Sequence, residues 1–224
     1  MSLLTPSFHS NSFGLTDLNA IDPETSPADY LRTQHPKGDQ YAKYLRAVAV
    51  YHELPIRTGV RVHGLAKEGD HFIASTDKGD LKADIVVWAT GQFFSPRDQA
   101  FPGAELALHS SKVNDWNELE GDEFTVIGGY ESGLDAALNL VDLGKSVSLH
   151  SRGEPWSSDD PDPSRSISPR TFDRLREILQ SSEKSKKLEL FKNSDIRRIE
   201  ESQGWWTLFD PVSYTHLTLP TNGC

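Results

Sequence analysis

A regular pattern of hydrophobic and polar positions between residues 124 and 152 gives the clearest prediction in the chain. Phe124, Val126 and Ile127 form a β-branched and aromatic run that is typical of a buried parallel strand. A glycine-rich turn follows, after which hydrophobic residues recur at helical spacing. Residues 146–150 then alternate as a second strand. This order predicts one βαβ unit.

The helix of this unit is predicted to have one hydrophobic face and one polar face. The hydrophobic face carries Leu134, Leu138 and Val141, and the polar face carries Asp135, Asn139 and Asp142. Gly144 follows the last turn, where a left-handed residue commonly ends a helix.

Weaker patterns predict the elements that precede this unit. The first is a long loop with hydrophobic anchors over residues 1–27, followed by a helix over 39–53. Two strands are then predicted over 56–65 and 70–75, with a hairpin-type turn at 77–80. A buried strand over 85–88 and a loop over 95–116 complete this part of the chain. The segment over residues 56–80 therefore predicts a small antiparallel meander.

Further elements are predicted after the βαβ unit. An exposed polar loop covers residues 157–168. Ser168 and Pro169 form an N-cap with proline at the first helical position, and a helix follows them. Three short strands are predicted over residues 188–191, 196–199 and 205–209.

Composition narrows the class of protein. The 224 residues are 36% hydrophobic and 25% charged, as in ordinary globular proteins. The net charge of −10 argues against nucleic-acid binding and against an anionic membrane surface. No run has the length of a membrane span, and no signal segment opens the chain. We therefore expect a cytoplasmic protein.

Cysteine usage narrows the chemistry. The single cysteine is Cys224, which excludes a disulfide framework, a CxxC redox pair and a cysteine-ligated metal cluster within these residues. No metal site is expected.

The turn at residues 128–133 carries candidate binding chemistry. Free N–H groups at a helix start attract anions, and glycine lets the backbone approach a pyrophosphate closely. Tyrosine takes the middle glycine position of the fingerprint G-x-G-x-x-G, because the residues in order are Gly128, Gly129, Tyr130, Glu131, Ser132 and Gly133. We interpret the turn as a dinucleotide-binding site; a tight βα turn that binds nothing is the alternative.

The end of the second strand bears on which dinucleotide binds. NAD sites usually carry an acidic residue there, about 20 residues after the fingerprint, for the ribose hydroxyls. The strand instead ends in His150, Ser151 and Arg152, and Glu154 comes later. The Arg152 guanidinium is suited to a 2′-phosphate, with His150 and Ser151 as further donors. These residues favour NADP(H); a solvated surface arginine is the alternative.

Two other sets of residues are candidates for ligand contacts. Ala89, Thr90 and Gly91 follow the predicted strand over 85–88, and such small residues at a strand end let a ligand lie against the backbone. A strand that simply ends in a glycine turn is the alternative. His109 stands in the loop over 95–116, where a surface hydrogen bond is the commoner role of a histidine.

The end of the chain has a different character. Residues 212–221, VSYTHLTLPT, resemble a translated transposase adapter of the kind used in sequencing libraries. We therefore expect the natural sequence to end near residue 211, with residues 212–224 as an added tail. A genuine C-terminal tail is the alternative.

Two motifs together resemble a known group of proteins. DIVVWATG at residues 84–91, followed by VIGGYESG at 126–133, is similar to the order found in flavoproteins with two dinucleotide-binding domains. The chain resembles the flavin-containing monooxygenases and the thioredoxin-reductase-like pyridine nucleotide oxidoreductases. The resemblance implies an α/β fold with two Rossmann-like domains, the first lacking its N-terminal βαβ unit and the second truncated.

The same resemblance implies cofactors and a division of the chain. Residues 1–118 would be a partial FAD-binding domain with the meander, and residues 122–211 a partial NAD(P)H-binding domain. FAD would lie partly on residues 89–91 and NADP(H) on residues 128–133, with hydride transfer from NADPH to the flavin. A small-molecule substrate or electron acceptor and a homodimer are the expected partners.

Departures from the resemblance leave the activity open. The FAD fingerprint is missing, so we expect a fragment truncated at both ends and inactive alone. The monooxygenase motif FxGxxxHxxx(Y/F/W) is only echoed, since Phe101 and Gly103 are present but His109 comes two residues late. We favour an FAD-dependent, monooxygenase-like NAD(P)H oxidoreductase and assign no catalytic residue. The alternatives are a disulfide or pyridine nucleotide reductase without CxxC, a non-catalytic redox sensor, and a gene product that does not fold stably.

Overall fold

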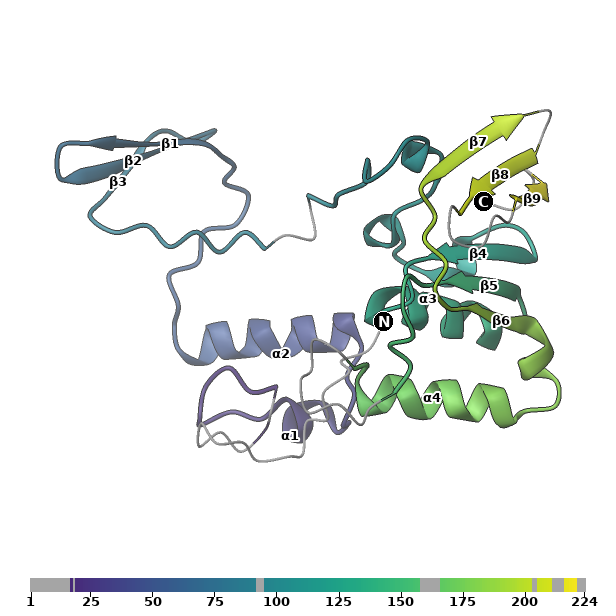
Figure 1. Cartoon of the computed structure of the whole chain (residues 1–224). Coiled ribbons are helices and arrows are strands. Elements are labelled where there is room, and N and C mark those ends of the chain that lie inside the picture. Colours follow the sequence, from purple (N-terminus) through teal and green to yellow (C-terminus); the bar gives the residue numbers. More distant parts are fainter. Residues whose placement is uncertain are drawn as a thin grey trace. The chain divides into compact units, whose positions relative to one another are not determined.

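The computed structural model describes residues 17, 19–91, 95–157, 166–202, 205–210 and 216–220. The chain divides into two compact units, one of Ser7–Gln92 and the other of Phe93–Cys224 with Met1–Pro6 (Figure 1). The two units are defined by how the chain packs. The domains predicted over residues 1–118 and 122–211 are instead defined by the cofactor that each would bind, so that division remains a prediction. Among the described residues, no helix combines the length and the apolar character that crossing a bilayer requires.

The unit of residues 7–92 combines two helices with a small sheet. Its helices are α1 (Pro27–Leu31) and α2 (Gly38–Tyr51), and its strands are β1 (Val62–Glu68), β2 (His71–Thr76) and β3 (Leu81–Ala83). The strands pair in the order β1-β2-β3, and both pairs are antiparallel. The predicted helix and meander are thus confirmed, although β1 begins later than predicted, and α1 and β3 were not predicted.

The loop before α1 is tied to α2 by buried polar contacts. The Tyr44 side chain is buried in α2, and its hydroxyl lies 2.7 Å from the Thr25 hydroxyl. Asp17 is also buried, and its carboxylate accepts hydrogen bonds from the Ser26 hydroxyl and the Ala28 N–H. Ile21, which lies in the loop over residues 1–27 for which hydrophobic anchors were predicted, is exposed and is not such an anchor.

The strand predicted over residues 85–88 is wrong. These residues form no strand, and Ile85, Val87 and Trp88 are 81%, 82% and 72% exposed. A buried parallel strand needs a neighbouring strand for its backbone hydrogen bonds. In the described part of this unit the sheet ends at β3, and no strand pairs with residues 85–88. The hydrophobic side chains of residues 85–88 are therefore not buried against a neighbouring strand in the described part of this unit.

The unit of residues 93–224 is built on a parallel sheet. The sheet contains β4 (Glu123–Ile127), β5 (Ser146–His150) and β6 (Leu188–Phe191) in that order, and both pairs are parallel. Helix α3 (Glu131–Asp142) connects β4 to β5, and α4 (Pro169–Gln180) lies between β5 and β6. The predicted βαβ unit is confirmed, including the left-handed Gly144 after α3, with φ of 83°.

Both helices cover one face of the parallel sheet. The strands advance in one direction, and crossovers between parallel strands are right-handed, which places α3 and α4 on the same side. One buried core joins them to the sheet. Its members are Leu134, Ala137, Leu138, Leu140, Val141, Val147, Leu149, Ile167, Leu175, Ile178 and Leu188. Their burial explains why this region follows the sequence pattern so closely.

A second, antiparallel sheet follows in the same unit. It contains β7 (Arg198–Ser202), β8 (Trp205–Phe209) and β9 (His216–Pro220) in that order. A small core of Ile196, Ile199 and Leu208 packs against Ile127 of β4, among others. Strand β9 lies within the stretch predicted to be an added tail, and its pairing with β8 leaves that prediction untested.

Short 3₁₀ turns, which were not predicted, occur in two stretches of this unit. In the predicted loop over 95–116 and just after it lie η1 (Ala104–Leu106), η2 (Ser110–Lys112) and η3 (Trp116–Glu118). The fourth turn, η4 (Lys184–Lys187), precedes β6.

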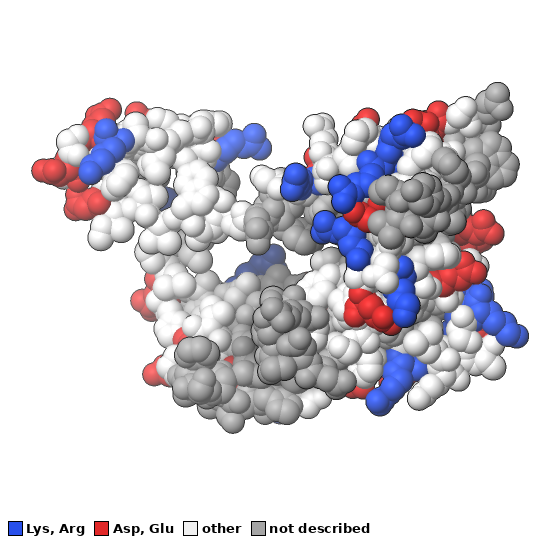
Figure 2. All heavy atoms as spheres, in the orientation of Figure 1, with Lys and Arg blue, Asp and Glu red and all other residues white. Residues whose placement is uncertain are grey.

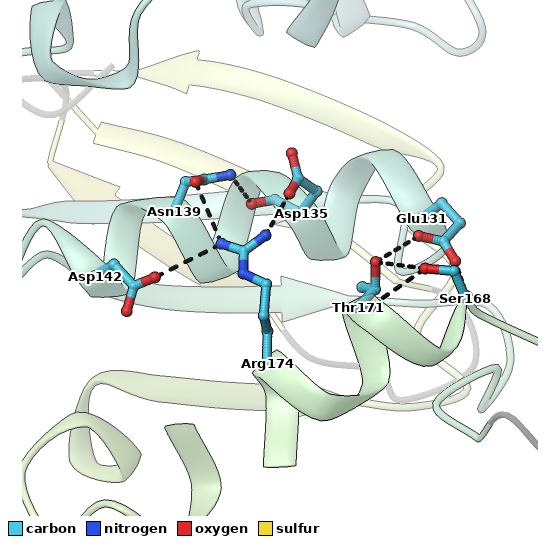
Figure 3. Close-up of polar contacts among 7 residues, drawn as sticks. All are labelled: Glu131, Asp135, Asn139, Asp142, Ser168, Thr171 and Arg174. Carbon is cyan, nitrogen blue, oxygen red and sulfur yellow. Dashed lines mark hydrogen bonds and ion pairs between the residues drawn. The ribbon is translucent and has the colours of Figure 1, made fainter. Parts of the chain in front are cut away.

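The predicted polar face of α3 is partly a buried interface. Asp135 is only 4% exposed, because α4 packs on this side of α3. Its carboxylate pairs with the Arg174 guanidinium of α4 at 2.6 Å. The same guanidinium lies 3.3 Å from the Asn139 side-chain oxygen and 3.6 Å from the Asp142 carboxylate (Figure 3). A charge that looks solvent-facing in the sequence thus joins two helices.

Candidate functional site

A pocket of about 1200 Å³ opens at the carboxyl ends of β4 and β5. Ligands of open α/β sheets bind at this edge. The pocket brings together most of the residues that the sequence singled out, namely Gly128, Gly129, Tyr130, Ser132, Gly133, His150, Ser151 and Arg152. Ala89, Thr90 and Gly91 belong to the other unit and are exposed, so they form no enclosed site by themselves.

Each glycine of the turn has its own structural reason. Gly128 has φ of 105°, a conformation that side chains rarely allow. A Cβ atom at Gly129 would overlap the Ser151 side chain at the end of β5. A Cβ atom at Gly133 would overlap the backbone carbonyl of Gly128. The turn is therefore as tight as the fingerprint implies, with α3 starting directly against β4.

The N-terminus of α3 is open toward ligands. Tyr130 is the N-cap residue, and its side chain makes no capping hydrogen bond to this helix. The first intrahelical bond runs from the Leu134 N–H to the Tyr130 carbonyl at 2.8 Å, so the N–H groups of the preceding turn have no partner within the helix. Because these groups carry the positive end of the helix dipole, they suit an anion.

The side chains of Tyr130 and Glu131 are directed to α4 and the residues before it. The Tyr130 hydroxyl donates to the Ser166 carbonyl at 2.5 Å. The Glu131 carboxylate accepts from the Ser168 N–H and, at 2.8 Å, from the Thr171 hydroxyl (Figure 3). Glu131 therefore caps α4, and its carboxylate is not among the groups that line the pocket.

His150 is a buried, neutral residue in the pocket wall. Its Nδ1 lies 2.8 Å from the Ser194 hydroxyl, and its ring stacks on Phe191 with centroids 4.6 Å apart. Burial lowers the pKa of the His150 imidazole, with the Asp210 carboxylate acting in the opposite direction. The other ring nitrogen, Nε2, is buried and has no hydrogen-bond partner among the residues that the structure describes. His150 can thus offer a neutral hydrogen bond but not a positive charge.

Arg152 is an available cation beside the turn. Its side chain is exposed and forms no ion pair with any other residue that the structure describes. The acidic residue next to it, Glu154, instead pairs with Lys192 at 3.1 Å. Lys and Arg side chains are interspersed with Asp and Glu over the visible face of this unit (Figure 2). Phosphate recognition would therefore depend on individual residues rather than on a general positive field.

Comparison with protein families decides the class of this protein. Residues 1–216 match the family described as pyridine nucleotide-disulphide oxidoreductase. The chain belongs to the pyridine nucleotide-disulphide oxidoreductase family. The predicted resemblance is thus confirmed, and at the level of the family so are the enzyme class and the use of FAD and NAD(P)H.

Individual relatives of this family member differ in activity. The chain is 30% identical over 142 residues to a ferredoxin–NADP reductase of Levilactobacillus brevis. The matched region covers 61% of this chain and 43% of the relative. Two solved structures share its fold. Bacillithiol disulfide reductase Bdr of Staphylococcus aureus has a TM-score of 0.74 at 20% identity, over 100% of this chain and 61% of that one. L-lysine 6-monooxygenase of Pseudomonas syringae has a TM-score of 0.68 at 17% identity, over 98% and 67%.

The chain spans only part of the length of these relatives, as the coverage values state. The family assignment therefore supports an oxidoreductase with a dinucleotide site. Whether the acceptor is oxygen, a disulfide or another protein belongs to the proposals below.

Several residues of this family member contribute to the site without a signal in the sequence. The Trp156 indole N–H donates to the Gly129 carbonyl at 3.0 Å, and Ser194 holds His150. Both contacts join residues more than 25 positions apart, which no local pattern reveals. Gly103 of the echoed motif packs on β7, because a Cβ atom there would overlap the Ile199 carbonyl. His109 accepts from the Ser111 N–H at 3.2 Å, a local bond.

We expect His150 to make the stability of this unit depend on pH. Below its ordinary pKa of about 6.5 the imidazole is protonated in the unfolded chain, whereas burial keeps it neutral when folded. The unfolded state then binds more protons, so stability is full above that pH and falls as the pH drops below it. In urea titrations between pH 7.5 and 5.5, His150→Asn should lose less stability than the wild type. The exposed His63→Asn serves as control, and parallel wild-type and His150→Asn curves would contradict the expectation.

Proposed function

We propose that the pocket beside Gly128 binds the dinucleotide NADPH and that the protein acts as an FAD-dependent NAD(P)H oxidoreductase. The observation that carries this proposal is the N-terminus of α3, which receives no side-chain cap from Tyr130, begins three residues after the left-handed Gly128 and lies at the pocket. A pyrophosphate fits such a terminus, because it accepts N–H bonds and is favoured by the helix dipole.

The residues around the turn supply separate parts of the binding site. The backbone N–H groups of residues 131–133 would hold the pyrophosphate, with Gly129 and Gly133 keeping the backbone close. Arg152 would pair with the 2′-phosphate, and Ser151 and the neutral His150 would add hydrogen bonds. Residues 89–91, which are small and exposed, would form one wall of the FAD site.

The bound cofactors supply hydride chemistry, with NADPH as donor and the flavin as acceptor. The residues named above would orient the dinucleotide, and other parts of the site would bind the electron acceptor. We favour a monooxygenase-like use of the reduced flavin. This preference rests on the lack of a CxxC pair within the 224 residues, which removes the usual dithiol route to a disulfide substrate.

Titration calorimetry of the 224-residue chain with NADPH tests the binding step. We expect one site per chain, and competition by 2′-phospho-ADP-ribose, which shares the pyrophosphate and the 2′-phosphate. No heat of binding would contradict the proposal. For a protein that also carries bound FAD, loss of the flavin absorbance on adding NADPH tests the hydride step. Dinucleotide binding without flavin reduction would instead support the non-catalytic sensor.

The acceptor is tested by the products of NADPH oxidation. A monooxygenase-like enzyme consumes oxygen, and oxygen uptake should accompany NADPH loss. If NADPH is consumed only when a low-molecular-weight disulfide is added, the reductase alternative is correct.

Replacing Arg152 should change the choice of dinucleotide. A charge-assisted hydrogen bond contributes about 1.5–3 kcal/mol, so Arg152→Gln should weaken NADP⁺ binding by about 10- to 150-fold. NAD⁺ has no 2′-phosphate, and its affinity should change little. The matched control is Arg176→Gln, an exposed arginine on α4. Equal losses for NADP⁺ and NAD⁺ would show that Arg152 does not read the 2′-phosphate.

A further inference from the structure

The two residues that depart most from a simple glycine turn both reach the same neighbouring segment. Tyr130 occupies the middle glycine position, and its hydroxyl donates to the Ser166 carbonyl. Glu131 follows it, and its carboxylate accepts from the Ser168 N–H and the Thr171 hydroxyl (Figure 3). Consecutive residues of the turn thus hold the chain just before α4 and the first turn of α4.

Several further contacts fix the start of α4, so the hydrogen bonds from Tyr130 and Glu131 are not isolated surface contacts. Ser168 is the N-cap of α4, and its own hydroxyl accepts from the Thr171 N–H at 3.2 Å. Glu131 adds a carboxylate to the same N-terminus, which the helix dipole favours. Ile167, between the two contact points, is buried in the core of the unit. The start of α4 is therefore fixed from three directions.

The turn is also held from the segment that follows β5. The Trp156 indole donates to the Gly129 carbonyl, and the Ile167 N–H donates to the Ser157 carbonyl at 3.1 Å. Trp156 and Ser157 after β5 are therefore joined by hydrogen bonds both to the glycine turn and to Ile167 just before α4.

We propose that Tyr130 and Glu131 are positioning residues that couple the occupied pocket to the start of α4. This inference rests on the proposed function, since the ligand of the pocket is taken to be a pyridine nucleotide. A pyrophosphate that orders the backbone of the turn also orders the side chains of Tyr130 and Glu131. These side chains in turn hold residues 166–171. A glycine at position 130 would leave the phosphate-binding N–H groups of the turn in place but would leave the start of α4 uncoupled from them.

Hydrogen–deuterium exchange of the 224-residue chain, with and without NADP⁺, tests the coupling. In the wild type, NADP⁺ should slow exchange both at residues 128–133 and at the amides of residues 166–175. In Tyr130→Phe, which keeps the ring and loses one hydrogen bond, protection at residues 128–133 should persist while protection at the start of α4 is lost or greatly reduced. A merely structural role would speed exchange at α4 equally with and without NADP⁺.

Binding measurements give a second readout. Loss of one hydrogen bond of about 1 kcal/mol should weaken NADP⁺ binding by about fivefold in Tyr130→Phe. Glu131→Ala should lose the coupling in the same way. Glu131→Gln, which keeps an acceptor for the Ser168 N–H, should restore most of it.

The outcomes separate this inference from the proposed function. If NADP⁺ protects residues 128–133 but not residues 166–175 of the wild type, the coupling is wrong and the nucleotide site stands. If NADP⁺ protects neither stretch, the proposed function fails and the coupling fails with it. Unchanged protection of α4 in both Tyr130→Phe and Glu131→Ala would also overturn the coupling.

Discussion

Replacing Arg174 with alanine should lower the free energy of unfolding of the 93–224 unit by about 3–5 kcal/mol, the usual cost of removing one partner of a buried ion pair. The Arg174 guanidinium is 2.6 Å from the Asp135 carboxylate, whose side chain is 5% exposed. One carboxylate oxygen of Asp135, Oδ2, already has no hydrogen-bond partner in the described part of the chain. Without Arg174 the second oxygen would lose its partner too, and a buried charge would be left uncompensated.

Two variants distinguish this cause from general damage to the interface. Lys184→Ala removes an exposed ion pair with Asp142 and should cost less than about 1 kcal/mol. Arg174→Met combined with Asp135→Leu removes both charges at similar volume and should recover most of the stability of the wild type. Urea titration followed by circular dichroism measures all three. A double variant as unstable as Arg174→Ala would show that packing, and not the unpaired charge, causes the loss.

The parts of the fold that the sequence predicts correctly are those determined by neighbouring residues. The βαβ unit follows from local periodicity, one glycine turn and one helix cap, and all of them lie within residues 123–150. The meander of β1, β2 and β3 likewise needs only alternation and a tight turn. Such features depend little on what packs against them from elsewhere in the chain.

The errors occur where a distant segment decides the outcome. Asp135 looks solvent-facing along α3, yet Arg174 lies 39 positions away and buries it. The run over residues 85–88 has the composition of a buried strand, but a strand also requires a pairing partner, which the described part of the chain does not provide. The hydrophobicity of a segment indicates that its burial would be favourable. It does not indicate whether another segment of the chain packs against it.

The candidate site shows the same division. The glycine turn and Arg152 could be identified from the sequence, because both belong to a local strand–turn–helix pattern. The side-chain roles of Tyr130 and Glu131 could not, since their partners are 36 to 40 positions away. Sequence spacing indicates that a phosphate could bind the backbone here. Only the tertiary contacts show that side chains of the same turn also bind the start of α4.

Gly133→Ala should give the largest effect on the site itself. The added Cβ would overlap the Gly128 carbonyl, and both groups belong to the backbone region where β4 turns into α3. No rotamer change can relieve such an overlap, so the helix start must move away from the strand. We expect a cost of about 3 kcal/mol or more in unfolding free energy, at the upper end of overpacking effects. Because the same movement displaces the N–H groups proposed for the pyrophosphate, NADP⁺ binding should fall below detection.

Gly153→Ala is the matched control, since a Cβ there meets nothing within 4 Å. It lines the same pocket and should leave stability nearly unchanged and NADP⁺ affinity within about twofold, as expected for a substitution without steric conflict. Calorimetry with NADP⁺ and urea titration of both variants give the comparison. If Gly133→Ala binds NADP⁺ as well as Gly153→Ala does, the close approach of α3 to β4 is not what forms the phosphate site. The pocket would then have to bind its ligand through Arg152 and its neighbours alone.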